Sequence, residues 1–464
     1  MVQKIEDFIN NRTLYILFGI LALSTLLRLY HINFQSLWID ELYSIVPTAP
    51  ENSLQSVIEY SKGDQPPLFF IYLHYIFKIF GYNEIVGRIA CAFIGLLSIP
   101  IIYYLGKECH NKATGVFAAL LTGVNYFHIY YSQELRFYSM AFLFSTLSYL
   151  FFVRAFKRND LINFVGYAIF TIGLLYIHYY GMIIFFGQGL TFIVLLKYKR
   201  DIKFIILSIC AGLAIVAAFS PWLPIIFNDL TDVLPHIKIP EPHFVIKYFY
   251  YYTGKDALTT SLFCFFIFLF FKAFYSYNSL SIENKSVYLI VLIWIVWSYL
   301  FPYIRSILVT PMLADRYTII TLPAWIILLA LGWEKMRNLK LKYGFPIILV
   351  LSSIINLIFF RQYYSIIKKD QWRDASQIVI SKNYSHYPVY STYPWHFSFY
   401  FRNSIDKVKD LYSADYASDK QFWLLQAHVP EEEMESDIKQ LNKSFEIIER
   451  HSFYGANAVL FKVK

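Results

Sequence analysis

The chain has 464 residues, of which 57% are hydrophobic, 20% aromatic and only 16% charged. This composition is too apolar for an ordinary soluble domain and indicates a polytopic membrane protein. The formal net charge of +9 could suggest nucleic-acid binding, but the basic residues stand in short groups between apolar runs. That distribution is typical of loops that flank membrane spans, so we expect no nucleic-acid partner.

The first apolar run covers residues 13–30. It is long enough to cross a bilayer core of about 30 Å. No small-residue cleavage site follows it, so we interpret it as an anchor and not as a removed signal peptide. Further runs bring the predicted number of spans to about eleven: 84–106, 113–131, 137–153, 161–177, 180–196, 202–220, 257–275, 286–301, 317–332 and 344–361.

Residues 67–80 form another apolar segment, but it is short for a span and contains His74 and Lys78. If this segment does not cross the membrane, one set of short loops carries most of the Lys and Arg residues, as cytoplasmic loops do. Counting it as a span would reverse every later loop and remove this asymmetry. We therefore predict an interfacial helix at 67–80, a cytoplasmic N-terminus and an extracytoplasmic loop 31–66.

The composition changes after residue 361, because the remainder carries charged and polar residues throughout. Segments with strand and helix periodicity alternate there, which favours a small α/β domain. The predicted fold is mainly α: a polytopic membrane helical bundle at 1–361 and a small extracytoplasmic α/β domain at 362–464. The expected strands are 388–393, 421–426 and 456–463, and the expected helices are 372–382 and 431–443.

Two adjacent carboxylates, Asp40 and Glu41, follow the first span. One interpretation is a solvated loop or the first turn of a helix, where acidic residues are common. The other is a site at the membrane surface, because the same loop also supplies Trp38, Asp64 and Gln65. These three could position an acceptor, and a carboxylate beside the membrane could reach a lipid-borne and a water-borne substrate together.

A second polar cluster interrupts an otherwise apolar hairpin at Glu134, Arg136 and Tyr138. Charges inside a bilayer are costly, so their presence needs a reason. Glu134 and Arg136 could satisfy each other across the turn. Alternatively, the Arg136 guanidinium could hold phosphate oxygens through paired hydrogen bonds.

Two further candidates lie at predicted outer turns. His178 and Tyr179 fill the short turn between two spans, and Arg316 opens the tenth span. Residues of these types also occur at membrane surfaces as aromatic-belt or snorkelling side chains. On the predicted topology, however, Arg136 and Arg316 lie on the same side of the membrane as Asp40.

In their order along the chain, these motifs resemble those of polyprenyl-phosphate-dependent membrane glycosyltransferases of the GT-C class. The nearest likeness is to bacterial relatives of protein O-mannosyltransferases and of lipid A aminoarabinose transferases. The resemblance covers about residues 1–360, and the C-terminal domain is similar only in placement. One departure is Gln65, where many relatives carry His before Pro-Pro. The matching residues are Trp38, Asp40, Glu41, Gln65, Pro66, Pro67, Ser132, Gln133, Glu134, Arg136, Tyr138, His178, Tyr179, Tyr180, Gly181, Arg316 and Tyr317.

The resemblance implies transfer of a sugar, with inversion, from a polyprenyl-phosphate donor to an acceptor on the extracytoplasmic face of the cell membrane. A carboxylate takes the acceptor proton in such a reaction, and Asp40 stands where these families use one, with Glu41 orienting Asp40 or the acceptor. Fixed cations stabilise the leaving phosphate, and Arg136 and Arg316 are the candidates. The further donor-binding candidates are Glu134, Tyr138, His178 and Tyr179.

Three questions stay open at this point. A phosphate leaving group and the lack of a dense Asp/Glu/His cluster predict no obligatory metal, with a divalent cation as the alternative. The acceptor could be a protein, a lipid or a polysaccharide. Other functions are a lipid-linked polysaccharide polymerase or ligase, and a secondary transporter, although a transporter would have ionisable groups near the bilayer midplane.

Overall fold

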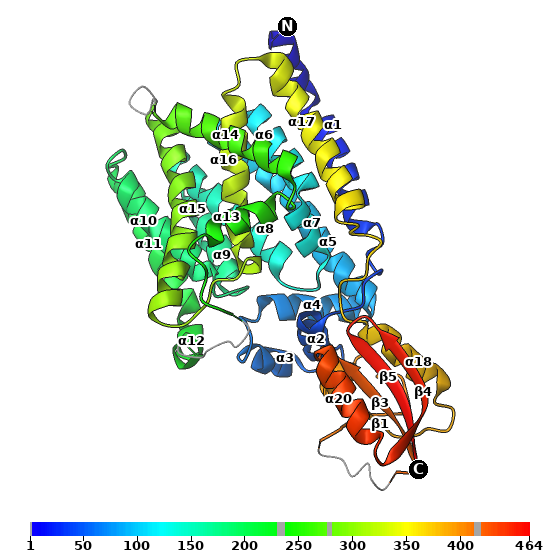
Figure 1. Ribbon diagram of the computed structural model, residues 1–464. Coiled ribbons are helices and arrows are strands. Elements are labelled where there is room, and N and C mark those ends of the chain that lie inside the picture. The colour runs from blue at the N-terminus through cyan, green and yellow to red at the C-terminus, as the bar shows by residue number, and fades with distance from the viewer. Residues whose placement is uncertain (1, 230–236, 276–280, 413–418) are drawn as a thin grey trace. The chain divides into compact units, whose positions relative to one another are not determined.

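The computed structural model describes residues 2–229, 237–275, 281–412 and 419–464 (Figure 1). Its contacts divide the chain into two compact units. The helical unit comprises Met1–Tyr30, Ile58–Tyr72 and Arg88–Tyr363. The sheet unit comprises His31–Val57, Leu73–Gly87 and Tyr364–Lys464, so two of its three segments come from within the predicted membrane domain.

The helical unit is built from apolar helices whose starts are fixed by side-chain caps. Asn111, Asp160, Asp201, Ser281 and Asn338 each accept a hydrogen bond from a backbone N–H of the helix that follows, which satisfies a donor that would otherwise lack a partner. The elements are α1 (Val2–Leu29), α5 (Glu84–Cys109), α6 (Lys112–Val124), α7 (Tyr126–Gln133), α8 (Tyr138–Arg158), α9 (Leu161–Leu175), α10 (Gly181–Leu195), α11 (Ile202–Phe219), η2 (Ser220–Trp222), α12 (Leu223–Asp229), α13 (Phe244–Tyr252), α14 (Ala257–Tyr275), α15 (Ile282–Leu308), η4 (Arg316–Ile320), α16 (Leu322–Glu334), α17 (Leu339–Ile355) and η5 (Asn356–Phe360).

Within the described ranges, seven helical segments are long and apolar enough to cross a membrane, which confirms a polytopic helical membrane protein. Four shorter apolar helices, α6, α9, α10 and α16, coincide with predicted spans. The total of about eleven spans stays a prediction. The seven segments are Arg12–Leu29, Glu84–Cys109, Tyr138–Arg158, Ile202–Phe227, Ala257–Tyr275, Ile282–Leu308 and Leu339–Phe360.

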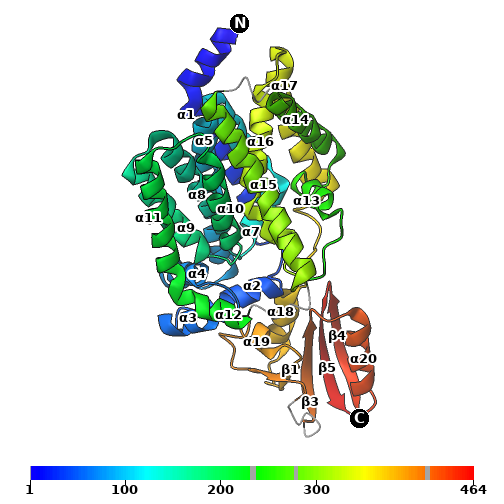
Figure 2. The same cartoon turned by 90° about the vertical axis from the view of Figure 1, so that its left-hand side faces the viewer.

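Inside the helical unit, α8 packs against α9, α9 against α11, and α10 against α15 (Figure 2). The short helix η4 packs against α8. Small residues allow close approaches between elements: a Cβ on Gly332 of α16 would lie 2.0 Å from the carbonyl oxygen of Phe266 in α14. The result is that η4 and the turn before α10 are held by the same group of helices.

The sheet unit contains a mixed sheet in the order β2-β1-β3-β5-β4, with β1 parallel to both β2 and β3, and β5 antiparallel to β3 and β4. The helix α18 packs on β3, β4 and β5. Two helices, α3 and α4, cross the division between the units. The elements are α2 (Ile39–Ile45), η1 (Val46–Thr48), α3 (Leu54–Ser61), α4 (Leu68–Phe80), α18 (Trp372–Lys382), β1 (Val389–Ser391), α19 (Pro394–Phe397), β2 (Val408–Asp410), β3 (Gln421–Ala427), α20 (Glu431–Leu441), β4 (Phe445–Phe453) and β5 (Ala456–Val463).

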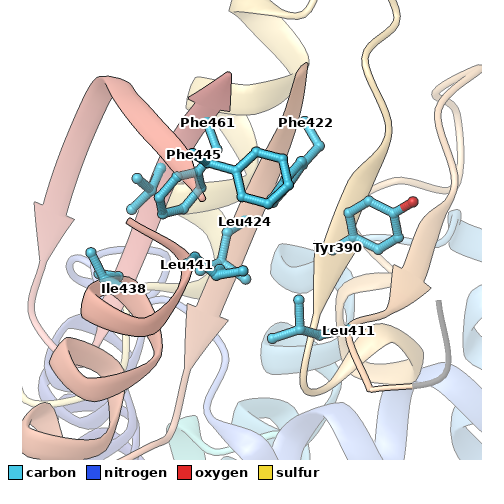
Figure 3. Close-up of a cluster of buried hydrophobic side chains, with 9 residues drawn as sticks. Tyr390, Leu411, Phe422, Leu424, Ile438, Leu441, Phe445 and Phe461 are labelled. Carbon is cyan, nitrogen blue, oxygen red and sulfur yellow. The ribbon is translucent and has the colours of Figure 1, made fainter. Parts of the chain in front are cut away.

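The core of this sheet follows from alternation along the strands. Phe422 and Leu424 of β3 point to one face, where they pack with Phe461 of β5 and with Ile438 and Leu441 of α20 (Figure 3). Successive strand residues point to opposite faces, so Trp423 is left for the other side, and it is also buried. The three predicted strands and both predicted helices are confirmed, whereas the sequence analysis did not identify β2, β4 or α19.

Candidate active site

The helix α2 holds the two adjacent carboxylates in the sheet unit. Trp38 precedes the helix in an extended conformation, and the Glu41 side chain accepts a hydrogen bond from the Trp38 backbone N–H at 3.2 Å. A carboxylate in this position satisfies a backbone donor at the helix start and favours the positive end of the helix dipole. The predicted helix-start interpretation therefore describes how Asp40 and Glu41 are held.

The two carboxylates have different surroundings. Glu41 is fully buried and forms an ion pair with Lys369 at 3.0 Å between Oε2 and Nζ. Asp40 is half-buried, because adjacent helical residues point in different directions around the axis. Glu41 is thus committed to holding the fold of the sheet unit, while Asp40 keeps the access that a proton acceptor needs.

The sheet unit also contains a hydrogen-bonded pair of Asp370 and His428, and the charge of Asp40 acts on this histidine. The Asp370 carboxylate lies 2.8 Å from Nδ1 of His428. This hydrogen bond, and then the negative charges of Asp370 and Asp40, raise the pKa of His428 against the opposing effect of burial. Asp370 is also closely confined, because a Cβ on Gly455 would lie 2.1 Å from its Oδ1 atom.

The helical unit holds a second charged group around Arg136. The Arg136 side chain is buried, and its guanidinium lies 3.5 Å from the carboxylate of Asp64, whose side chain is 30% exposed. The amide of Gln65 donates to the other oxygen of Asp64 at 3.4 Å. Asp64 and Gln65, which the sequence analysis assigned to acceptor positioning, therefore contact each other, and Asp64 also pairs with the predicted phosphate-binding arginine.

His178 lies between two aromatic rings, each of which also contacts one of the two arginines. Its ring stacks on Phe137 with centroids 4.3 Å apart and lies 4.9 Å from the ring of Tyr317. Arg136 lies over the Phe137 ring at 5.6 Å, and Arg316 lies over the Tyr317 ring at 5.4 Å. The structure thus brings Arg136 and Arg316 to the same aromatic group, to which the turn before α10 contributes His178.

The protonation of His178 follows from this environment. Burial, and then the charges of Arg136 and Arg316, lower the pKa of His178 to about 3. The ring is therefore neutral at physiological pH. Because Nδ1 accepts a hydrogen bond from the Tyr180 N–H at 3.1 Å, the proton of the neutral ring resides on Nε2. His178 can accordingly donate one hydrogen bond without adding a third positive charge.

The other predicted donor-binding residues lie around the same group. Tyr138 is fully buried, interacts electrostatically with both arginines and with Glu134, and its hydroxyl has no hydrogen-bond partner among the described residues. Glu134 is buried at the end of α7. The half-buried Tyr179 ring lies 6.5 Å from His178. We name Arg136, Arg316, His178, Tyr138 and Glu134 the arginine cluster.

The sequence analysis missed several charged residues with specific partners. Arg28 is fully buried and donates to the carbonyl oxygens of Thr122 and Gly123 and to His128, which ties α1 to α6 and α7. Arg28 lies one residue before the end of a span, which could have indicated a role in tying helices together. The same position is equally typical of a snorkelling arginine. Lys369, the partner of Glu41, gave no comparable signal, because the pair is separated by more than three hundred residues.

A metal site was not expected from the sequence. Among the residues that the structure describes, no group of three or more histidine, cysteine, aspartate or glutamate side chains could hold a metal ion. The absence of a metal requirement stays a prediction.

Comparisons with known proteins confirm the resemblance. The sequence model of the family described as dolichyl-phosphate-mannose-protein mannosyltransferase matches residues 64–225. A search of the curated proteins found no match. The matched segment contains Asp64, Gln65, Glu134, Arg136 and His178, which belong to the helical unit.

Similar solved structures extend the likeness to nearly the whole chain. ArnT from Cupriavidus metallidurans in the apo state is 11% identical, with a TM-score of 0.64 over 97% of this chain and 98% of that one. ArnT from the same organism bound to undecaprenyl phosphate is 12% identical, with a TM-score of 0.60 over 95% and 97%. The archaeal oligosaccharyltransferase AglB from Archaeoglobus fulgidus, in complex with an inhibitory peptide and a dolichol-phosphate, is 11% identical, with a TM-score of 0.58 over 96% and 74%.

Proposed function

We propose that this chain transfers a sugar from a polyprenyl-phosphate donor to an acceptor hydroxyl, because a mannosyltransferase family model matches residues 64–225 and the fold is similar to that of ArnT. The reaction takes place on the extracytoplasmic face of the cell membrane, in keeping with the distribution of Lys and Arg over the predicted loops. The observation that carries the proposal is the arginine cluster. In this cluster the guanidiniums of Arg136 and Arg316 lie near His178, whose neutral ring can donate one hydrogen bond.

The arginine cluster takes the phosphate of the donor. When the bond between the anomeric carbon and the phosphate oxygen breaks, that oxygen keeps the bonding electrons and its negative charge grows. Arg136 and Arg316 supply fixed positive charge, and the Nε2–H of His178 supplies a neutral donor. Groups that are already in place stabilise this charge most effectively in a site that excludes water. The similar ArnT structure bound to undecaprenyl phosphate supports a polyprenyl phosphate of that kind as the donor lipid.

Asp40 takes the proton of the acceptor. As the acceptor oxygen forms its bond to the anomeric carbon, its proton moves to the Asp40 carboxylate, which must come within about 3 Å of the hydroxyl. Attack from the side opposite to the leaving phosphate inverts the configuration. Asp64 and Gln65 act by holding Arg136, and Glu41 acts by fixing the helix that carries Asp40, rather than by touching the acceptor.

The proposal is tested with the purified full chain and a panel of undecaprenyl-phosphate sugars, with peptide, lipid A and polysaccharide acceptors in separate reactions. We expect one donor to be consumed, with release of undecaprenyl phosphate and an inverted linkage in the product by NMR. A retained linkage would exclude the direct displacement, and no consumption of any polyprenyl-phosphate sugar would overturn the donor class. Parallel reactions with EDTA determine whether a divalent cation is needed.

A further inference from the structure

A cavity lies in the helical unit among α8, α9, α10 and α11, well away from the arginine cluster. Its volume is 210 Å³ and its lining is almost entirely apolar, with Phe156, Phe164, Phe192 and Phe204 among the lining side chains. It lies beside the C-terminal part of α8, whereas the arginine cluster includes Tyr138, the first residue of α8. About fourteen residues of helix separate Phe152 from that first residue, which corresponds to roughly 20 Å along the axis.

Two glycines leave this cavity open. Gly189 of α10 and Gly212 of α11 both line it, and a Cβ added at either position would meet nothing within 4 Å. By contrast, a Cβ on Gly187, two residues earlier in α10, would lie 2.8 Å from the Trp297 side chain. On α10, therefore, the glycine that borders the cavity has open space around it, whereas the glycine two residues earlier is closely packed.

A polar side chain lines the apolar cavity at depth. Gln188 is fully buried, and its amide nitrogen donates to the Ser148 hydroxyl at 2.7 Å. The amide oxygen has no hydrogen-bond partner among the described residues. No water is available in the hydrocarbon region to satisfy such an atom. Only an occupant that carries a hydrogen-bond donor would remove this deficit.

A lysine borders the other end of the cavity. The ammonium of Lys199 lies 5.2 Å from the ring centroid of Phe156 and 5.0 Å from that of Phe204, and both rings line the cavity. The same ammonium donates to the carbonyl oxygen of Phe156. Lys199 is half-buried, and its ammonium itself lies over the aromatic rings at this end of the cavity.

The neighbouring loop is strongly basic. Between α10 and the first turn of α11, the chain carries Lys197, Lys199, Arg200 and Lys203 against one acidic residue, Asp201. Asp201 accepts hydrogen bonds from the backbone N–H groups of Lys203 and Phe204. Its charge is thus partly used to cap α11, and the loop that carries Lys199 keeps an excess of positive charge.

We propose that this cavity is a binding site for an anionic phospholipid, which inserts the end of one acyl chain among the phenylalanine rings and places its phosphate against Lys199. Basic pockets between membrane helices are suited to anionic headgroups, and an acyl chain matches the apolar lining. On the predicted topology the lipid belongs to the cytoplasmic leaflet, so the site is separate from the binding of the donor.

The test measures lipid retained by the purified full chain, by native mass spectrometry after exchange with phosphatidylglycerol or phosphatidylcholine. Gly212→Trp fills the cavity and Lys199→Gln removes the charge at its mouth. The matched controls are Gly344→Trp, at a glycine of α17 that also has open space around it, and Lys272→Gln, at an exposed lysine near the end of α14. Thermal unfolding confirms that each variant is folded.

We expect phosphatidylglycerol retention to fall at least fivefold in Gly212→Trp and Lys199→Gln and to be unchanged in both controls, with little retention of phosphatidylcholine by any protein. Equal retention by folded Gly212→Trp and the native chain would overturn the site. Retention of phosphatidylcholine equal to that of phosphatidylglycerol would overturn the role of the charge. Displacement by undecaprenyl phosphate at equal concentration would identify the occupant as the donor lipid and overturn the phospholipid assignment. Because the readout is lipid binding, failure here leaves the proposed glycosyl transfer untouched.

Discussion

Buried charge is arranged differently around Glu41 in the sheet unit and in the arginine cluster of the helical unit. In the sheet unit, Glu41 and Lys369 form a close pair of opposite charges, and Glu84 pairs with Arg373 at 2.9 Å. In the helical unit, two guanidiniums of like charge act on the same buried histidine, and the recorded ion pair of Arg136 with Asp64 is longer, at 3.5 Å.

From this difference we predict that the Glu41–Lys369 pair holds structure and that the arginine cluster serves the proposed chemistry. A buried pair with short contacts satisfies itself and mainly fixes geometry. Two guanidiniums close to one buried histidine are groups that can bind phosphate oxygens. The comparison therefore predicts loss of catalysis from changes in the arginine cluster and at Asp40, and loss of stability from changes at Glu41.

The largest effect is expected at Asp40. Asp40→Asn keeps the shape of the side chain, but an amide cannot take a proton at neutral pH. Turnover should fall by about 10²–10⁴-fold, as for loss of a general base, with little change in donor binding. Steady-state turnover and donor affinity of the purified variant are the measurements. Glu51→Gln, at a carboxylate of the sheet unit whose side chain is 54% exposed, is the control, and near-native turnover of Asp40→Asn would remove the proposed base.

A slightly smaller effect is expected in the arginine cluster. Arg136→Ala and Arg316→Ala each remove a charge from the developing phosphate, which should lower turnover by about 10²–10³-fold. Arg136→Lys should be intermediate, because it keeps the charge and loses the paired donors. Lys238→Ala, at an exposed residue of the helical unit, should be near native. Equal turnover of all these proteins at matched expression would contradict the phosphate role.

At Glu41 the expected loss is one of stability. Glu41→Gln removes the carboxylate charge that pairs with the ammonium of Lys369, whose side chain is only 11% exposed, and breaking a buried pair in this way costs about 3–5 kcal/mol. The unfolding midpoint should fall clearly, and the double variant Glu41→Gln with Lys369→Met should recover part of it. Glu51→Gln, which breaks an exposed pair with Arg402, should cost less than about 1 kcal/mol. A stable Glu41→Gln protein with strongly reduced turnover would instead place Glu41 in the chemistry.

Much of this arrangement could be predicted from the sequence, because apolar periodicity and charge bias act locally. The membrane helices and the three strands with clear alternation were identified, as was the resemblance carried by ordered motifs. The strand β4, with its sequence Phe-Glu-Ile-Ile-Glu-Arg-His-Ser-Phe at 445–453, was missed because its charged residues obscure the apolar alternation. The assignment of residues 31–57 to the sheet unit depends on contacts with residues far along the chain.

The same limit applied to the site. The residue types predicted a general base at Asp40 and phosphate-binding cations at Arg136 and Arg316, but only packing shows that both arginines lie close to His178. The neutrality of His178 and the commitment of Glu41 to Lys369 also depend on contacts between distant segments. Sequence patterns identify which groups are available, whereas burial and neighbouring charge decide the state in which each group acts.

The smallest expected effect concerns the Asp370–His428 pair. The pKa of His428 is raised in the folded protein, first by its hydrogen bond to Asp370. A raised folded-state pKa gives stability that is fully present below the unfolded value of about 6.5 and is lost as the pH rises through the folded value. Because the His428 side chain is 43% exposed, solvent screens the pair and the contribution is small. Unfolding midpoints of the native chain and of His428→Gln should therefore differ at pH 5.5 and converge at pH 9. Asp370→Asn should remove the same pH dependence, since it removes the partner that raises the pKa. If the difference in unfolding midpoint between the native chain and His428→Gln grew with pH, the pair would contribute stability at high pH, and the prediction would be wrong.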